Sequence, residues 1–512
     1  MVGSTGISFS GLASGIDTQA IVQQLVALER LPIQSIQARR STESRKLDLV
    51  GNLGDLVKKL RDKAKDLQTS NQFRSNSATA SDASVATVAA DSSVIAGSHT
   101  IEVQRLAATD RWAFNAVSSR DQDLSNAAGR QVSFTVGQTA YSLTVDPTRS
   151  SLDEIANDLN AMAGADINAS VVNTGTESNP SFQLVVASKT AGEDGRITNL
   201  FSDVAGGAGS LTINYAAPTA GGVAQSTNNI TVGNDALALV DGLLVRRSDN
   251  DFSGVIEGLT IDVARTTTPG DPVVITVQPD REAVRAKIDG FVSAFNAVQS
   301  FINTQSTFTP SEDPDDNGGQ TGLLFGDSLL GGIRSALSRS LFGVSAQTVV
   351  GDAEGYSTLS LVGISRGRDG LLSVNESVFN AKFAENLDAL AGLFADDDGF
   401  DNGGAAAGDP NFYVDQTSDS GLMANLVREI DRMFGTLAGS TSATPLRGIF
   451  DAKQDALRAR IKLFDQDIQR KEDRVERYRE TITLQYARFE ELMSRLNAQG
   501  ASLGNALASN SR

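Results

Sequence analysis

A seven-residue repeat near the C-terminal end constrains the fold more than any other feature of this chain. Apolar side chains recur at every seventh position, four of the seven alternating core positions are also apolar (Leu457, Phe464, Tyr478 and Leu492), and no glycine or proline occurs from Phe450 to Gln499. A repeat this strict, with charged flanks, favours a coiled coil over an amphipathic helix packed inside its own domain. Its members are Ile461, Ile468, Val475, Ile482, Phe489, Leu496 and Leu503.

A second helical region is predicted at the N-terminal end. Asp17 is a suitable N-cap, Pro32 predicts an interruption, and a further helix is expected from about Ile33 to Leu67. Its apolar stripe matches that of the C-terminal helix, so the two ends can pair and bring both termini to one end of the molecule. The apolar positions are Ile21, Leu25 and Leu28 before the proline, and Leu49, Leu53, Leu56 and Leu60 after it.

Residues between about 75 and 280 carry the two-residue alternation that is typical of strands. A hairpin is predicted where the alternating runs 132–136 and 141–145 flank Gly137-Gln138, and a turn is predicted at Asp241-Gly242. The segment 216–229 is predicted to be a linker. Further strands are expected at 101–103, 182–186, 211–215, 237–247, 259–265 and 273–277, and helices at 152–162, 283–302 and 422–434.

The charge distribution separates the ends of the chain from its middle. The chain of 512 residues has a net charge of −18, but residues 70–450 hold 22 basic and 45 acidic side chains, while both helical ends are slightly basic. An acidic body argues against a nucleic-acid partner, because phosphate binding requires a basic face. No signal peptide and no run of about 20 apolar residues is visible, so we expect no membrane insertion.

The sequence offers little that could support catalysis or metal binding. It has no Cys and a single His, His99, and it lacks the common nucleotide-binding, metalloprotease and serine-hydrolase motifs. We therefore expect His99 to be a structural strand residue, and the chain to be neither an enzyme nor a cofactor-binding protein. Asp313–Gly318 fits the first six positions of a calcium loop, but Leu324 stands where the bidentate Glu is needed, which favours a solvated acidic turn.

Several blocks along the chain are distinctive when they are taken together. The run from Gly6 to Asp17 reads GISFSGLASGID and is followed by IVQQLVALERLPI. The other blocks are the C-terminal run Tyr486–Leu507 and the internal runs 97–107, 236–258, 287–302, 322–328 and 359–369. In this order they resemble the bacterial flagellar filament capping proteins (flagellar hook-associated protein 2 family), and the segment 131–197 resembles a short module shared by flagellar hook-associated proteins.

The resemblance implies an α+β multidomain fold, with terminal coiled-coil or helical-bundle leg domains and β-rich plate (head) domains inserted in the middle. We expect the seven-residue repeat and the N-terminal apolar stripes to form the assembly interface. The Gly-rich start up to Ile16 is expected to become ordered on assembly. The predicted parts are terminal leg helices at 1–43 and 470–512, a helical-bundle leg domain at 44–78 and 275–469, an inner plate domain at 79–112 and 228–274, and an outer, inserted plate domain at 113–227.

The resemblance also implies a structural role at the distal tip of the bacterial flagellum, outside the cell, after a transient stay in the cytoplasm. It implies a homo-oligomeric ring of about five or six subunits. The ring would promote the insertion of exported flagellin and prevent its leakage. The other implied partners are hook–filament junction proteins and a cytoplasmic export chaperone on the C-terminal helix, and some members bind host mucin. The absence of Cys suits type III export of an unfolded chain.

Three alternatives compete with this interpretation. The first is another filament or junction component with similar terminal helices, against which the blocks at 236–258 and 359–369 argue. The second is a surface adhesin that binds mucin through its β-rich domains, which direct mucin binding by residues 70–280 would support. The third is an enzyme that uses His99 or the acidic loops, which glycosidase assays could reject.

Overall fold

The computed structural model describes residues 17–164, 166–219, 222–310, 319–342, 355–397, 403–405, 421–435 and 448–509. The chain forms two compact units, which we call the helical unit (Met1–Phe73 with Arg285–Arg512) and the β unit (Arg74–Val284). Long helices at both ends and β-rich material in the middle confirm the predicted α+β multidomain fold. The division into four parts stays a prediction.

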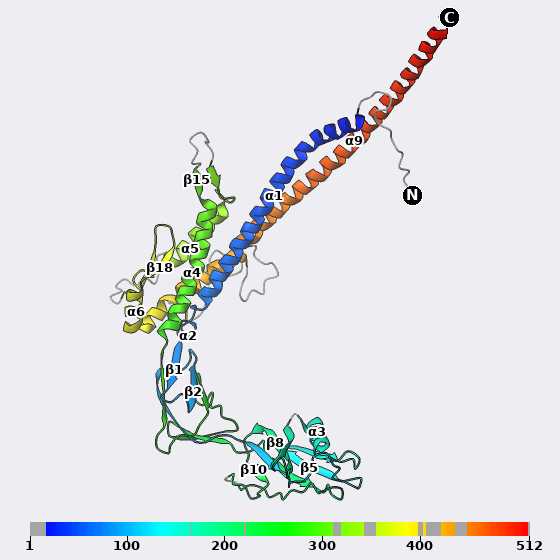
Figure 1. Cartoon of the computed structure of the whole chain (residues 1–512). Coiled ribbons are helices and arrows are strands. Elements are labelled where there is room, and N and C mark those ends of the chain that lie inside the picture. The colour runs from blue at the N-terminus through cyan, green and yellow to red at the C-terminus, as the bar shows by residue number, and fades with distance from the viewer. Residues whose placement is uncertain are drawn as a thin grey trace. The chain divides into compact units, whose positions relative to one another are not determined.

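The helical unit is built around two long helices, α1 (Thr18–Lys65) and α9 (Ile449–Ser509), which lie side by side (Figure 1). The predicted helix at 422–434 is present with the same bounds, and the apolar face predicted within 283–302 is buried. The shorter elements are α2 (Ser70–Phe73), α4 (Arg281–Ser306), β15 (Phe308–Pro310), β16 (Gly319–Thr321), α5 (Ser328–Phe342), β17 (Ile364–Arg366), β18 (Leu372–Val374), α6 (Glu376–Glu385), α7 (Leu387–Phe394) and α8 (Leu422–Phe434).

The interruption predicted at Pro32 is wrong, because α1 continues through it. Proline removes one backbone hydrogen bond and crowds the preceding turn, so a helix accepts it only where other contacts compensate. Val26 and Ile33 lie on either side of Pro32 and are both buried in one cluster with Val475 of α9. Packing along α9 therefore holds the two halves of α1 in one helix, and the N-terminal half arches over its partner (Figure 1).

The first part of the β unit, which we call the first lobe, is a five-stranded antiparallel sheet with the order β1-β14-β3-β11-β12, accompanied by the pair β13-β2. Alternate residues of these strands bury an apolar core that includes Ile101, Val103 and Phe252. The strands are β1 (Asn76–Ala80), β2 (Ala86–Ala90), β3 (Gly97–Arg105), β11 (Ala236–Val240), β12 (Leu243–Arg247), β13 (Leu259–Val263) and β14 (Val273–Pro279).

The second part of the β unit, which we call the inserted lobe, interrupts the chain between β3 and β11. It has a four-stranded sheet, β10-β4-β8-β7, a three-stranded sheet, β6-β5-β9, and one helix over a separate apolar core. The hairpin and the helix predicted here are confirmed. The elements are β4 (Thr109–Ala113), β5 (Gln131–Val136), β6 (Thr139–Thr144), α3 (Leu152–Ala163), β7 (Ile167–Asn173), β8 (Phe182–Ala191), β9 (Ile197–Ser202) and β10 (Asn229–Thr231).

Two local predictions for the inserted lobe are wrong. Residues 211–215 form no strand, although the amide N of Asn115 donates to the carbonyl of Thr212 at 2.9 Å. The end of the predicted linker is packed rather than free: Asn228 is buried, and its Nδ2 donates to the carbonyl of Ala113 at 2.7 Å. Ser and Asn occur in this segment because their side chains satisfy buried backbone groups, which its composition alone does not reveal.

A buried carboxylate joins the strand that enters the inserted lobe to the segment that leaves it. The Asp110 side chain is fully buried and accepts four hydrogen bonds. Trp112 Nε1 and the amide N of Ile197 donate to Oδ2, both at 2.8 Å, and Asn229 Nδ2 and the amide N of Gly233 donate to Oδ1, both at 3.0 Å. A buried charge is tolerated when every lone pair is used in this way.

The predicted turn at Asp241-Gly242 is confirmed and is fixed by the single histidine. Asp241 and Gly242 both have positive φ, 47° and 81°, as a tight hairpin turn requires. His99 Nδ1 lies 2.8 Å from Asp241 Oδ2, and the amide N of Thr100 donates to Asp241 Oδ1 at 2.7 Å. Burial raises the pKa of the Asp241 carboxyl, but the hydrogen bonds from His99 and Thr100 together lower it by more than burial raises it. The pKa of Asp241 therefore lies below its usual 3.8.

We expect Asp110→Ala to lower the free energy of unfolding of the inserted lobe by about 3–5 kcal/mol, because it leaves several buried donors without an acceptor. Trp112 is the only tryptophan and donates to Asp110, so its fluorescence during urea unfolding reports the change directly. Asp121→Ala is the control, since that side chain is 82% exposed. A change of less than about 1 kcal/mol for Asp110→Ala would contradict the structural role of this carboxylate.

We expect the destabilisation caused by Asp241→Asn to depend on pH. A carboxyl whose pKa is lowered by folding stabilises the native state above its unfolded pKa of about 4, and this contribution disappears as the pH falls through the folded pKa. The difference in free energy of unfolding between parent and variant should therefore have its full value at pH 6 and become smaller as the pH is lowered. Urea titrations across this range measure it, and a difference that does not change with pH would contradict the assignment.

Candidate assembly interface

The N-terminal end of α1 is defined by a side-chain cap. Asp17 Oδ1 accepts a hydrogen bond from the amide N of Ala20 at 2.9 Å, which satisfies one of the free donors in the first helical turn. The predicted N-cap is therefore confirmed. Residues 1–16, including the Gly-rich start that was expected to order on assembly, lie outside the described residues.

An antiparallel apolar seam joins α1 to α9. Val26, Ile33 and Val475 are buried in one cluster, with Val22 and Ile468 packed against it. Residues later in α1 face residues earlier in α9, so the two helices run in opposite directions. The predicted pairing of the terminal helices is thus confirmed.

Three ion pairs follow this seam and report its register. Glu29 pairs with Arg474 at 3.4 Å, Arg40 with Asp465 at 2.8 Å, and Glu43 with Arg460 at 3.6 Å. Each pair has at least one solvent-exposed partner and contributes at most about 1 kcal/mol, so the apolar seam carries most of the stability and the charges select the register. The sequence analysis missed Glu43, which is 9% exposed and also contacts Lys46 at 3.1 Å.

The C-terminal half of α1 is buried more completely than its N-terminal half. Leu53 and Leu60 of the predicted stripe are fully buried, whereas Leu49 and Leu56 are half-buried. Val50 and Val57 are instead fully buried beside the two leucines. This half of α1 packs against α8 as well as α9, so its buried face is wider than one stripe and is shifted by one residue.

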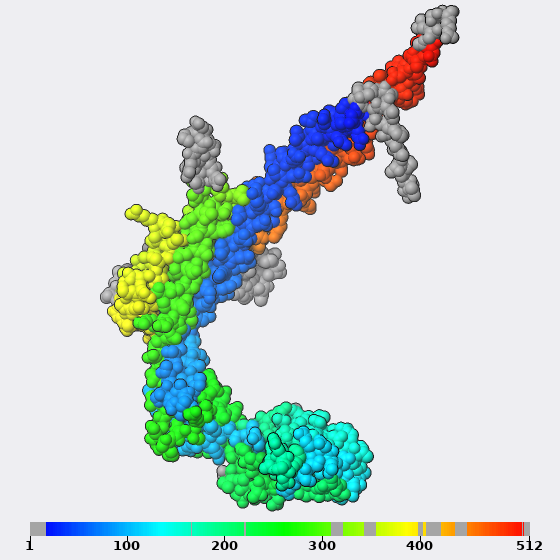
Figure 2. Space-filling view, in the orientation of Figure 1, coloured from blue at the N-terminus to red at the C-terminus, as the bar shows by residue number. Residues whose placement is uncertain are grey.

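The helix α9 continues past the point where its partner begins. A groove at this point is lined by Thr18 and Val22 of α1 and by Leu484, Tyr486 and Ala487 of α9. Beyond it, the last part of α9 extends past the start of α1, as both views show (Figures 1 and 2). At 1.5 Å per residue, the stretch from Tyr486 to Ser509 is about 35 Å long.

The apolar repeat continues along this extension without a partner among the described residues. Phe489 is 40% exposed, Leu492 57%, Leu496 51% and Leu503 62%. Single exposed leucines are common on protein surfaces, but a continuous stripe at heptad spacing is typical of a helix that binds another helix. This stripe, which we call the α9 extension stripe, is the strongest candidate for an intermolecular surface in the helical unit.

The structure thus places the predicted interface residues in three settings. Most of those at the seam are buried or half-buried, those in the C-terminal half of α1 are buried or half-buried in the helical core, and those at the C-terminal end of α9 are exposed. Val475 and Ile482 are buried at 3% and 6% exposure, Ile21, Leu25, Ile461 and Ile468 are half-buried, and Leu28 is 62% exposed. Their role as one assembly interface stays a proposal.

The other candidate sites from the sequence give no competing interface. The calcium-like run Asp313–Gly318 lies outside the described residues, and no cluster of three or more His, Asp or Glu suited to a metal is found in the part of the chain that is described. Asp396, just after α7, is buried and pairs with Arg428 at 3.1 Å, which is a structural contact within the helical unit. None of the described helices is both long and apolar enough to cross a membrane.

Comparison with known families identifies two matching regions. The description "Flagellar hook-associated protein 2 N-terminus" matches residues 14–110, and "Flagellar hook-associated protein 2 C-terminus" matches residues 233–498, which is just over half of the chain. The two regions lie on either side of residues 111–232, which form most of the inserted lobe.

Individual proteins are similar over nearly the whole length. The A-type flagellar hook-associated protein 2 of Pseudomonas aeruginosa is 25% identical, over 99% of this chain and 98% of its own. The flagellar hook-associated protein 2 of Xenorhabdus nematophila is 23% identical, over 97% and 98%. The D1-D2-D3 domains of the flagellar cap protein FliD from Escherichia coli share the fold with a TM-score of 0.56 at 20% identity, covering 80% of this chain and 99% of that one.

We expect Val475→Asp to separate the N-terminal half of α1 from α9. It places a charge in the seam and should reduce the stability of the pairing by about 3 kcal/mol. Hydrogen–deuterium exchange of the amides in 18–33 should then accelerate, while exchange in α8 stays unchanged. Gln466→Asp, at an exposed position of the same helix, is the control. Equal protection of 18–33 in both variants would contradict the seam.

Proposed function

This chain belongs to the flagellar hook-associated protein 2 family, and on that premise we propose that it forms a homo-oligomeric ring which inserts exported flagellin at the filament tip. Members of the family are structural cap proteins of the flagellar filament, not enzymes, and their place is the filament tip outside the cell. The ring, the insertion of flagellin, the prevention of its leakage and the other partners are the proposed part.

The α9 extension stripe is the single observation that carries this proposal. Burying a large apolar side chain contributes about 1.5–3 kcal/mol, so even half of this value at four positions makes a helix–helix contact favourable. A homo-oligomer multiplies such contacts, because each subunit presents the same stripe. The stripe would dock on helices of flagellin or of neighbouring subunits and anchor the cap on a filament that is still growing.

The charge distribution supports different roles for the acidic body and for the terminal helices. Residues 70–450 carry the acidic excess, whereas the terminal helices are nearly neutral and alternate in charge. Like charge on the body keeps subunits and their cargo from aggregating, and mixed charge on the helices permits close packing against similar helices. We propose that the helices enter the filament and that the β unit covers the growing end.

The same stripe explains why an export chaperone is a plausible partner before secretion. A heptad stripe with four large apolar side chains would associate non-specifically in the cytoplasm unless another helix covered it. We propose that the chaperone occupies the α9 extension stripe and that flagellin, junction proteins or other subunits replace it after export.

We expect substitution of Phe489, Leu492 and Leu496 by Gln to abolish filament growth and to release monomeric flagellin into the medium. The ring itself should persist if the β unit carries the contacts between subunits. Electron microscopy of the purified protein, counting subunits end-on, and immunoblots of secreted flagellin measure the two outcomes.

The matched control is Ser494→Gln with Ala501→Gln. Both residues are exposed on the same helix, about 200° around the axis from the stripe. Removal of residues 500–512 tests the end of the stripe separately. Filaments of normal length on the triple variant would refute the proposed role of the stripe, and a monomer at assembly concentrations would refute the ring.

A further inference from the structure

The two connections between the lobes of the β unit run side by side. Ala108, on the way into the inserted lobe, pairs with Asn234, on the way out, through backbone hydrogen bonds of 2.9 and 3.2 Å. The amide N of Gly192, which follows β8, donates to the same Ala108 carbonyl at 3.1 Å. Three segments of the chain therefore meet at one point, which we call the lobe junction.

Two glycines show how closely these segments approach. A Cβ atom on Gly192, whose φ is 89°, would lie 2.7 Å from the Ser248 carbonyl oxygen and 2.8 Å from Asp235 Oδ1. A Cβ atom on Gly233 would lie 2.9 Å from the Gly192 carbonyl oxygen. Real Cβ atoms do not make contacts this short with backbone, so glycine is required at Gly192 both for its backbone conformation and for space.

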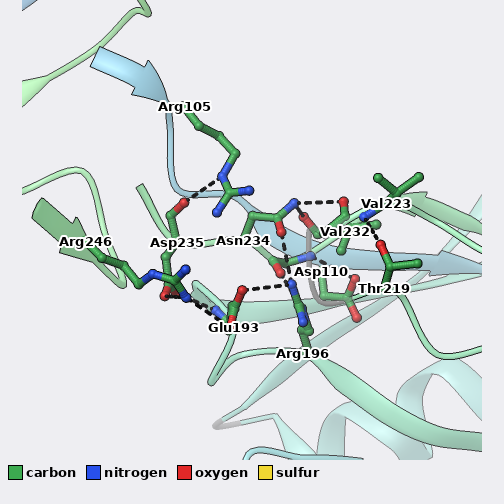
Figure 3. Close-up of polar contacts among 12 residues, drawn as sticks. Arg105, Asp110, Glu193, Arg196, Thr219, Val223, Val232, Asn234, Asp235 and Arg246 are labelled. Carbon is green, nitrogen blue, oxygen red and sulfur yellow. Dashed lines mark hydrogen bonds and ion pairs between the residues drawn. The ribbon is translucent and has the colours of Figure 1, made fainter. Parts of the chain in front are cut away.

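Charged side chains hold the loop after β8 against the first lobe (Figure 3). Arg246 of β12 reaches Glu193 at 3.4 Å and Asp235 at 3.5 Å, and the amide N of Glu193 donates to Asp235 Oδ1 at 2.7 Å. Arg105 Nε also donates to the Asp235 carbonyl at 3.0 Å. Asp235 thus receives contacts from the inserted lobe and from two strands of the first lobe.

A second arginine fixes the chain where it leaves the inserted lobe. Arg196 Nε donates to the Gly233 carbonyl at 2.6 Å, and its Nη2 contacts Asn234 Oδ1 at 3.0 Å and Glu193 Oε1 at 3.4 Å. Glu193 therefore lies between Arg196 of its own lobe and Arg246 of the first lobe. The Arg196 side chain is only 15% exposed, so it forms the inner part of the network.

We propose that Arg246, Glu193 and Asp235 form an ionic lock that fixes the inserted lobe on the first lobe, and that opening this lock turns the paired connections into a hinge. The backbone pairing at Ala108 and Asn234 survives opening, because it does not involve these side chains. Each lobe also keeps its own apolar core. The lock therefore controls the angle between two bodies that stay folded, and this inference does not rest on the proposed function.

The balance of contacts predicts how strong the lock is. The Arg246 side chain is 55% exposed and Glu193 is 31% exposed, so their ion pair is partly solvated and sensitive to salt. Loss of the pair should speed exchange of the Gly192 and Glu193 amides about fivefold, because both belong to the loop that the lock holds against the first lobe. Gly192→Ala should have a larger effect, because it forces the loop away from Ser248 whatever the salt concentration.

The absence of cysteine allows a direct measurement in the full chain. Spin labels on Thr144→Cys, an exposed residue of β6, and Thr276→Cys, an exposed residue of β14, report the distance between the lobes by pulsed electron resonance. The parent should give one narrow distribution. Arg246→Ala and Glu193→Gln should widen it, and about 1 M salt should widen the parent in the same way.

Arg120→Ala is the matched control, because Arg120 forms an ion pair with Asp153 at 2.6 Å, shorter than either pair of the lock, inside the inserted lobe and away from the junction. Glu193→Gln keeps the size of the side chain, so it carries the test if Arg246→Ala alters folding, which Trp112 fluorescence detects. Widening in the lock variants but not in the control supports the proposal. A parent-like distribution in both lock variants, or equal widening in the control, overturns it.

Discussion

The antiparallel pairing of α1 with α9 is the contact on which the rest of the helical unit depends. It joins segments more than four hundred residues apart, as the pairs Arg40–Asp465 and Glu43–Arg460 show. Closing so long a loop costs conformational entropy, which a continuous apolar seam can offset but isolated surface ion pairs cannot. Because both ends of the chain are committed to this seam, everything between them must return to the point where it left.

That requirement explains why the β unit is an insertion and why it contains another insertion. The chain leaves the helical unit near Phe73 and returns near Arg285, and within the β unit it leaves the first lobe near Arg105 and returns near Asn234. In each of these two insertions, the segment that leaves and the segment that returns must lie side by side. At the lobe junction, buried Asp110 and the lock residues hold the two connections together by polar contacts.

Sequence patterns predicted those parts of the molecule in which neighbours along the chain determine the structure. The heptad repeat identified α9, the Asp241-Gly242 pair identified a hairpin turn, and Asp17 identified the start of α1. Pro32 was misjudged because its local cost is offset by packing on a helix that lies far away in sequence. The helices that carry the predicted interface residues are present, but the sequence did not distinguish the buried members from the exposed ones, and their role as an interface stays a prediction.

The residues of the lobe junction could not have been found in this way. Three of the four hydrogen-bond donors to Asp110 lie 87 to 123 positions away along the chain, and the sequence around Asp110 does not show that it is buried. The sequence also does not show that Gly192 and Gly233 are required for close approach of other segments, since most glycines in a β-rich chain occur in turns. Only the distance to a third segment shows that a side chain at Gly192 has no room.

The two kinds of contact suit two kinds of task. An apolar heptad seam has no strict requirement for one partner, since any helix with a matching stripe can fill it. The proposed exchange of partners on the exposed end of α9 depends on this property. The buried Asp110 carboxylate accepts only donors at fixed positions, and a partner that misplaces one of them leaves a buried polar group unsatisfied. Under the proposed function, exchangeable contacts therefore lie on the exposed end of α9, and contacts of fixed geometry lie where the chain passes between the two lobes.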